Sequence, residues 1–372
     1  MSTGKSTRIA ALGYYGFRNL GDEAVLAGIR HALAGEIGEA VDLLVLSNDP
    51  GATEVFHPGV RAVNRWQWRE SAAAMRGTDL FILGGGSLLQ DATSVKSVLW
   101  YALMAMMARR RSRRVLWWGQ GVGPLTSQAS RRLVRWIADQ ADAITVRDKN
   151  SADLLQTIGC RRSIEVVADP AFALEPASSG VTTGRDSCLL ALRPWRDDRL
   201  LQLGDGGLLA ALRRSFGAQQ ALTALPMHLP GDRRFAESLP GFSSSNTAVM
   251  DWAESGATIE ETIGSVAQAR YVVAMRLHAL IFAVRCAIPF VALSYDPKVD
   301  ALATAAGQED ILVSVESLDV AALQSALHGL TRNADARRER LQSFALEQGQ
   351  LARRPAMIAA GLLAEGGKPG RR

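Results

Sequence analysis

Short apolar runs alternate along most of the chain with longer segments whose apolar positions recur at helical spacing. In the first half, the runs predict strands and most of the intervening segments predict helices. The expected strands are Ile9–Gly13, Val41–Ser47, Asp79–Gly84, Val115–Gly119, Ala143–Val146 and Ile164–Ala168. The expected helices are Asp22–Gly35, Thr93–Arg110, Ser127–Ala141 and Asn150–Gly159. This alternation favours parallel βαβ units and a doubly wound sheet.

A polar stretch, EPASSGVTTGRDS at residues 175–187, interrupts the pattern and predicts a linker. A second alternation follows it. Its expected strands are Cys188–Leu192, Ala221–Pro226, Tyr271–Ala274, Phe290–Leu293 and Ile311–Val313. Its expected helices are Leu200–Phe216, Thr258–Ala269, Leu277–Ala287 and Lys298–Ala306, with two closing helices within Val320–Ala364.

The double alternation predicts an α/β protein with two Rossmann-like domains that face each other across a cleft. Ligands of open α/β sheets lie beyond the carboxyl ends of the strands, so both domains are expected to direct their loops at that cleft. The expected domains are residues 1–176 and 187–345, followed by a C-terminal helix and tail at 346–372.

Composition fits this picture. With 372 residues the chain is too long for one ordinary core, and 48% hydrophobic residues with a mean hydropathy of +0.03 are typical of a globular protein in water. The net charge of +5 is mild and requires no nucleic acid. Cys160, Cys188 and Cys286 are scattered, as expected of reduced thiols. We see no signal peptide and no apolar run near ~18 residues, so we expect a cytoplasmic protein.

Three glycine-rich corners follow expected strands of the first domain. They are GYYGFRNLGDE from Gly13, LGGGSLLQD from Leu83 and WGQGVGP from Trp118. Glycine lets a backbone approach a ligand, and a following helix offers N–H groups to it. Any one such corner is also typical of plain packing, but three at the strand ends of one domain favour a binding site. The candidate binding residues are Gly13, Gly16, Asn19, Gly85, Gly86, Ser87, Asp91, Gln120 and Gly121.

The acidic pair Asp22 and Glu23 distinguishes the first corner from a phosphate loop. The corner lacks G-x-G-x-x-G, and these carboxylates would repel a phosphate. They either stabilise the first turn of a helix through its dipole or orient and deprotonate the hydroxyls of a ligand. The corner therefore favours a sugar over a nucleotide.

Cations mark the strand ends of the second domain. Arg276, His278 and Lys298 stand at expected helix starts, where a positive charge opposes the helix dipole, so together they favour a bound anion. The alternative is a solvated arginine, a packed histidine and a surface lysine. Arg147, at the end of an expected strand of the first domain, either binds an anion or pairs with Asp148 or Asp169.

Two further features have two interpretations each. The segment SVLWYALMAMMARRRSRR at residues 97–114 is either a helix that contacts anionic lipid or a buried helix followed by a solvated basic turn. Trp66 and Trp68 either stack on a sugar ring or pack within the protein.

Six short stretches of the sequence together resemble the bacterial polysaccharide pyruvyl transferase family, in particular its cell-surface-anchoring (CsaB-type) branch. The resemblance covers about residues 8 to 330, although the segment between Asp197 and Ser255 matches nothing recognisable. The stretches are Gly13–Glu23, Gly84–Ser94, Gly119–Pro124, Ala168–Phe172, Arg276–Phe282 and Ser294–Val299.

The resemblance implies a GT-B-like fold and transfer of a pyruvyl group from phosphoenolpyruvate to a sugar, giving a ketal. His278, Lys298 and Arg147 match the family's donor-side histidine and basic residues. His278 is then the expected general acid, with Asp22 and Glu23 as further catalytic candidates. Arg147, Arg276 and Lys298 would balance the charge of phosphoenolpyruvate, with the first domain on the acceptor side and the second on the donor side.

The implied partners are phosphoenolpyruvate and a cell-wall or S-layer glycan, on a lipid-linked precursor at the inner face of the plasma membrane. No metal or cofactor is implied, because the sequence has no D-x-D motif and no His/Cys cluster with ligand spacing. A nucleotide-sugar glycosyltransferase and a non-catalytic glycan-binding module remain as alternatives.

Overall fold

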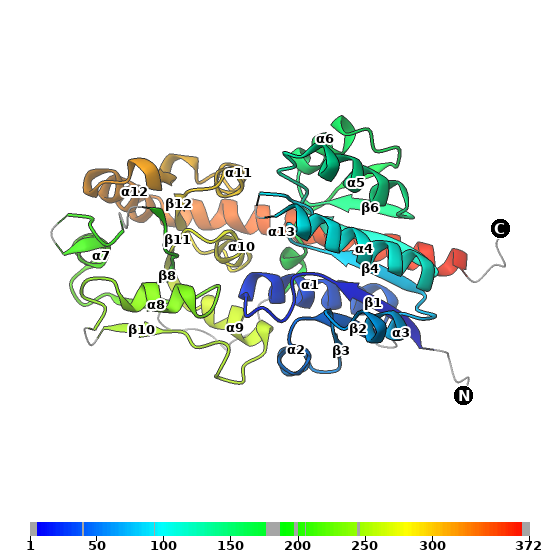
Figure 1. Ribbon diagram of the computed structural model, residues 1–372. Coiled ribbons are helices and arrows are strands. Elements are labelled where there is room, and N and C mark those ends of the chain that lie inside the picture. The colour runs from blue at the N-terminus through cyan, green and yellow to red at the C-terminus, as the bar shows by residue number, and fades with distance from the viewer. Residues whose placement is uncertain are drawn as a thin grey trace. The chain divides into compact units, whose positions relative to one another are not determined.

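The computed structural model describes residues 6–38, 41–92, 94–175, 187–196, 200–204, 206–243 and 246–366. The chain divides into two compact units (Figure 1). The first contains Met1–Phe17, Asp22–Leu174 and Gln348–Arg372, and the second contains Arg18–Gly21 and Glu175–Glu347. Residues 176–186 of the expected linker lie outside the described residues.

The first unit is built on seven parallel strands in the order β3-β2-β1-β4-β5-β6-β7. Residues Ile9–Leu12 of β1 and all of β4 are buried, as the apolar runs predict for strands covered on both faces. The bounds are β1 (Thr7–Leu12), β2 (Val41–Ser47), β3 (Arg61–Asn64), β4 (Leu80–Gly84), β5 (Arg114–Gln120), β6 (Ala143–Val146) and β7 (Ile164–Val166).

Helices cover this sheet, and most begin with a side-chain cap. Asp49, Ser94, Ser127 and Asp148 each accept a backbone N–H of the helix that follows. The helix α4 packs on β4 and β5, between α3 and α5. The bounds are α1 (Leu20–Ile37), α2 (Pro50–Phe56), α3 (Trp68–Ala74), α4 (Val95–Arg111), α5 (Gln128–Asp139), α6 (Lys149–Thr157) and the 3-10 helix η1 (Pro170–Ala173).

The second unit has six parallel strands in the order β10-β9-β8-β11-β12-β13. The strands are β8 (Ser187–Ala191), β9 (Ala221–Ala224), β10 (Thr247–Val249), β11 (Ala269–Ala274), β12 (Phe290–Ser294) and β13 (Val313–Ser314). The helices are α7 (Gly207–Phe216), α8 (Gly231–Glu237), α9 (Ile259–Val266), α10 (Leu277–Arg285), α11 (Pro297–Ala305), α12 (Val320–Arg332) and α13 (Ala334–Gly366), with the 3-10 helices η3 (Glu309–Ile311) and η4 (Val315–Ser317). The part of α13 from Gln348 onward belongs to the first unit.

Two expected elements of this unit are wrong at their bounds. The helix expected from Leu200 begins at Gly207, because Gly204 and Gly206 with positive φ interrupt it. The strand expected at Ile311–Val313 is instead η3 followed by β13.

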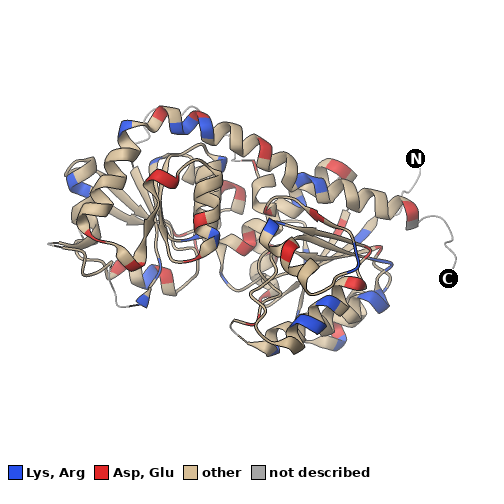
Figure 2. Ribbon diagram, turned by 90° about the horizontal axis from the view of Figure 1, so that it is seen from above, with Lys and Arg blue, Asp and Glu red and all other residues tan. Residues whose placement is uncertain are grey.

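Both units are therefore α/β layers around a parallel sheet, which confirms the two Rossmann-like domains. Lys, Arg, Asp and Glu positions are spread over the helices of both units (Figure 2). In each sheet the strand order reverses once, between β1 and β4 and between β8 and β11. Such switch points are where open α/β sheets bind ligands, beyond the carboxyl ends of the strands.

Candidate functional site

The switch point of the second unit carries a row of basic side chains. Arg193 follows β8, Arg276 and His278 follow β11, and Lys298 follows β12. Because these three strands are neighbours in a parallel sheet, their carboxyl ends lie at one edge. His228 follows β9, the next strand along. We call Arg193, His228, Arg276, His278 and Lys298 the basic edge.

Arg276 is held in place by Asp232 of α8. Its Nε donates to Asp232 Oδ2 at 2.9 Å, and its Nη2 bonds the other carboxylate oxygen. Asp232 Oδ2 also accepts the backbone N–H groups of Met227 (3.2 Å) and His228 (3.0 Å). The Asp232 side chain is 2% exposed and that of Arg276 is 18% exposed. The protein thus supplies its own anion for this arginine, while part of the side chain still faces solvent.

The segment Arg18–Gly21 belongs to the second unit through backbone hydrogen bonds. Leu20 N–H donates to Met227 O at 2.8 Å, and Leu229 N–H donates to Arg18 O at 3.0 Å. Asn19, a predicted binding residue, forms the bridge opposite His228 and accepts Gly21 N–H at 3.1 Å. These bonds tie the segment to the loop that surrounds Asp232.

Gly21 packs directly on the ring of His278. A Cβ at Gly21 would lie 2.3 Å from His278 Nδ1 and 2.6 Å from Cγ, so any larger residue would displace the ring. His278 is the second residue of α10 and is half-buried. The glycine thus fixes the position of the expected general acid.

Sequence reasoning missed the aromatic partners of the basic edge. Arg193 Nη1 donates to the Tyr295 hydroxyl at 3.2 Å, and its guanidinium lies 5.0 Å from the centre of the Tyr295 ring. The Trp195 ring lies 4.6 Å from that of Tyr295. The signal was present in ALRPW, a basic residue directly after an apolar run, which is the pattern that pointed to Arg276.

In the first unit, the glycines of the first corner make room for the protein's own atoms. A Cβ at Gly13 would lie 2.2 Å from the Tyr15 ring. A Cβ at Gly16, where φ is +75°, would lie 2.2 Å from Ser47 Oγ. Gly85 meets Val25 of α1 in the same way, at 1.9 Å. Close packing therefore accounts for these glycines. This is the alternative that the sequence left open for any single glycine-rich corner.

Glu23 is fully buried and both of its carboxylate oxygens are engaged. Oε1 accepts Gly16 N–H at 2.9 Å, and Oε2 lies 3.0 Å from His57 Nε2, whose side chain is also fully buried. In this geometry Glu23 positions the corner and does not face a ligand. His57 gave no sequence signal, because a single histidine at the end of a short helix resembles any packed residue.

Asp22 is the half-buried carboxylate of the same turn. Burial raises the pKa of the Tyr14 hydroxyl, and the negative charge of Asp22 raises it further. A Cβ at Gly86 would lie 3.1 Å from Asp22 Oδ1, so this carboxylate lies beside the second glycine corner.

Arg147 joins the second and third corners. Its Nη1 donates to Asp169 at 2.7 Å and its Nη2 to Ser87 Oγ at 2.8 Å. A Cβ at Gly121 would lie 3.0 Å from both Arg147 Nε and Ser87 Oγ. Asp169 is thus a partner of Arg147, and Asp148 lies 3.7 Å from its Nε, as the second interpretation of this arginine stated. The pair is nearly buried, with 7% of the arginine and 6% of the aspartate side chain exposed.

Gln120 and Asp91 hold neighbouring loops together. Gln120 Nε2 donates to Gly86 O at 2.9 Å. Asp91 accepts the N–H groups of Thr126 (2.8 Å) and Ser127 (2.9 Å) at the start of α5. Burial alone would raise the pKa of Asp91, but these hydrogen bonds outweigh burial and lower this pKa to about 2. Asp91 therefore acts as an ionised tie between two loops.

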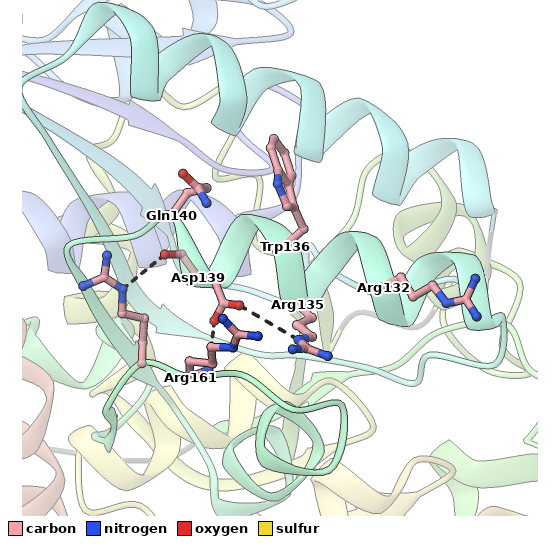
Figure 3. Close-up of a pocket in the computed structure, with 7 residues that line it drawn as sticks. Arg132, Arg135, Trp136, Asp139, Gln140 and Arg161 are labelled. Carbon is pink, nitrogen blue, oxygen red and sulfur yellow. Dashed lines mark hydrogen bonds and ion pairs between the residues drawn. The ribbon is translucent and has the colours of Figure 1, made fainter.

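Two pockets of the first unit lie away from these residues. One, of about 730 Å³, is bordered by the end of α5 and by Arg161 and Arg162 before β7, at the amino edge of the sheet (Figure 3). The other, of about 490 Å³, is lined by Arg65, Trp66 and Trp68 and by residues of α4. The first contains none of the predicted site residues, whereas the second contains Trp66 and Trp68, which the sequence predicts either to stack on a sugar ring or to pack within the protein.

Comparisons with known proteins bear on the family and the fold. A family model described as "Polysaccharide pyruvyl transferase" matches residues 19–297. A search of curated protein sequences finds no match.

Solved structures similar to the chain are GT-B-fold enzymes. A Listeria monocytogenes protein described as a UDP-N-acetylglucosamine 2-epimerase has a TM-score of 0.63 at 14% identity, covering 99% of this chain and 98% of its own. Anabaena Alr3699/HepE, in complex with UDP and glucose, has a TM-score of 0.60 at 12% identity, covering 96% and 99%. The UDP-GlcNAc 2-epimerase of Methanocaldococcus jannaschii has a TM-score of 0.60 at 13% identity, covering 95% and 99%. At such identities the likeness establishes the GT-B fold alone.

Proposed function

The chain belongs to the polysaccharide pyruvyl transferase family, and we propose that it transfers a pyruvyl group from phosphoenolpyruvate to a sugar of a cell-surface glycan, forming a pyruvate ketal. A lipid-linked precursor as acceptor and the cell-surface-anchoring branch are part of this proposal. The observation that carries it is the basic edge, where four adjacent parallel strands end in cationic or titratable side chains.

The basic edge suits phosphoenolpyruvate because this donor carries a phosphate and a carboxylate. Arg193 and Lys298 supply positive charge at the ends of β8 and β12, and Arg276 supplies the exposed part of a guanidinium already oriented by Asp232. Tyr295, hydrogen-bonded to Arg193, adds a hydroxyl. We assign the donor to this edge.

The reaction needs one proton on carbon and one on the leaving group. The methylene carbon of phosphoenolpyruvate takes up a proton, two sugar oxygens bond to the adjacent carbon, and the bond from that carbon to the phosphate oxygen breaks. The two hydroxyl protons balance the methyl group and the released phosphate. His278 is the proposed acid, since an imidazolium gives up its proton near neutral pH.

The proposed acceptor side is the glycine-rich edge of the first unit. Asp22 is the carboxylate that could accept a proton from a sugar hydroxyl there, and Arg147 positions Ser87 through the hydrogen bond from its Nη2 to Ser87 Oγ. Glu23 takes a positioning role in this proposal, because both of its oxygens hold the protein itself.

Turnover by a His278→Gln variant tests the chemical role. Phosphate release from phosphoenolpyruvate and a mass gain of one pyruvyl unit are measured with a panel of glycolipid acceptors. We expect kcat to fall ~10²–10⁴-fold, because a general acid acts in the transition state. His328→Gln, an exposed position on α12, is the matched control. Near-native kcat in folded His278→Gln would end the assignment.

A nucleotide-sugar glycosyltransferase is the second candidate, since the Anabaena neighbour was solved with UDP and glucose. It predicts sugar transfer from a UDP-sugar and no phosphate release from phosphoenolpyruvate. Transfer from a UDP-sugar by the same preparation would favour this candidate over ours. Binding of a glycan with no turnover of either donor would favour a non-catalytic module.

A further inference from the structure

A large share of the exposed apolar side chains lies on one helix and the turn beside it. Ten large apolar residues stand out as exposed among the described residues, and five of them are on or next to α4. Val95, Leu99 and Leu103 are each 48% exposed and recur at every fourth position, so they form one stripe. Trp66 and Trp68, before and at the start of α3, are 54% and 60% exposed.

The two tryptophans and the stripe form one surface. Trp66, Trp68, Leu103 and the last turn of α4 line a common hollow of about 490 Å³, together with Met106 and Met107. The position of Trp66 is fixed, because its Nε1 donates to Asn48 Oδ1 at 2.8 Å and its ring lies 5.3 Å from that of Trp100. We call Trp66, Trp68, Val95, Leu99, Leu103, Arg110 and Arg111 the α4 face.

The charge of the α4 face is positive. Arg109 pairs with Asp142, but Arg110 and Arg111 make no ion pair with any residue that the structure describes. Arg69 stacks beside Trp68 at 5.2 Å, and Lys96 is exposed in the first turn of α4. Glu70 on α3 is the acid that follows Arg69 in the chain.

We propose that the α4 face docks on the surface of a bilayer containing anionic lipids. Tryptophan and leucine enter the boundary between headgroups and acyl chains, and arginines at one end of the helix contact anionic headgroups. The helix lies on the surface, since no described helix has the length and apolarity needed to cross a bilayer. A second copy of the chain fits less well, because it would bring the positive charges of the two α4 faces together. The proposal rests on this surface and not on the proposed reaction.

Co-sedimentation with vesicles tests the proposal. The vesicles are phosphatidylcholine, with or without about 30 mol % phosphatidylglycerol. We expect binding only to the anionic vesicles, weakening as salt rises from about 0.1 M to about 0.5 M. Leu99→Ser combined with Leu103→Ser should lower the partition coefficient roughly tenfold. Arg110→Gln combined with Arg111→Gln should lower it by about fivefold for each arginine.

Matched controls come from surfaces elsewhere on the chain. Leu346→Ser with Met357→Ser removes apolar side chains of α13 that are 68% and 58% exposed, and Arg332→Gln with Arg340→Gln removes exposed charge. These variants should bind vesicles like the wild type. Absent binding by the wild type, or equal losses in the controls, would overturn the proposal. So would a dimer in light scattering that Leu99→Ser with Leu103→Ser converts to a monomer, because a second copy would then cover the face.

Discussion

Both carboxylate oxygens of Glu23 are bonded inside the protein. Substitution of Glu23 therefore tests whether these two contacts stabilise the first glycine-rich corner, Gly13–Glu23. Substitution by alanine leaves Gly16 N–H and His57 Nε2 buried without their partner. A buried group that loses its partner keeps its desolvation cost, so we expect Glu23→Ala to lower the free energy of unfolding by ~2–4 kcal/mol. Urea denaturation followed by circular dichroism measures this change.

A double-mutant cycle makes the same prediction sharper. Because His57 and Glu23 share one buried contact, adding His57→Ala to Glu23→Ala should cost clearly less than the sum of the two single changes. Glu36→Ala, at an exposed position of α1, should change the free energy by less than about 0.5 kcal/mol. If the losses of unfolding free energy in Glu23→Ala and His57→Ala were additive in the double variant, the two residues would not be energetically coupled.

The residue scale also shows what the sequence could not reveal. Arg276 was correctly singled out as a cation at a helix start, but its partner Asp232 lies 44 positions away and is brought there by the fold. Gly13, Gly16 and Gly21 were recognised as sites of close approach. Only the structure identifies Tyr15, Ser47 and His278 as the groups that approach them, because one sequence does not say which side chains meet.

At the scale of elements, buried strands inside a sheet were the most predictable. Val41–Ser47 and Ala143–Val146 match their expected bounds, because apolar β-branched runs leave few alternatives. The short edge strands β3 and β10 and the seven-residue α8 were missed. Each buries too few side chains to leave a periodic pattern, and α8 supplies Asp232, which orients Arg276.

The tie between Asp91 and the start of α5 predicts a pH dependence of stability. The pKa of Asp91 is about 2 in the folded protein, below the ordinary value of 3.8. A lowered folded pKa stabilises the fold above about pH 4, and this contribution is lost as the pH falls from about 4 to about 2. We expect Asp91→Asn to lower the free energy of unfolding by about 1–2 kcal/mol near pH 6, after allowance for solvent screening.

Denaturant unfolding of the wild type and Asp91→Asn across this pH range checks the sign. The difference between the two proteins should shrink towards acid and be lost only below pH 2, where the wild-type carboxyl is protonated in both the folded and the unfolded state. Asp153→Asn, at an exposed position of α6, should show no such trend. A difference that persists unchanged at low pH would mean that charge on Asp91 is not what ties the loops.

At the scale of the whole molecule, two parallel sheets each reverse their strand order once, and chemistry-bearing side chains gather at both reversals. Carboxylate and hydroxyl groups lie at the β1/β4 reversal and cations at the β8/β11 reversal. The alternation of elements predicted both sheets, whereas the division of roles came from charge at strand ends. An anionic donor and a hydroxylated acceptor are the pair of substrates that this division matches.

That division predicts which ligand stabilises the protein. If phosphoenolpyruvate binds the basic edge, a concentration about 100-fold above its Kd should add ~2.7 kcal/mol to the folded state and raise Tm by several degrees. Lys298→Ala should weaken binding by ~1.5–3 kcal/mol, the scale of a charge-assisted hydrogen bond, and so reduce that rise to about half or less at the same concentration. Its own stability should change little, because a cation in the first turn of α11 opposes the helix dipole. Lys96→Ala, which removes an exposed lysine of α4, should keep the full rise in Tm.

Calorimetric scans with phosphoenolpyruvate, inorganic phosphate and UDP compare the ligands directly. A rise in Tm with UDP and none with phosphoenolpyruvate would move the assignment to a nucleotide-sugar donor. Equal rises with phosphoenolpyruvate in the wild type, Lys298→Ala and Lys96→Ala would place the bound anion away from Lys298.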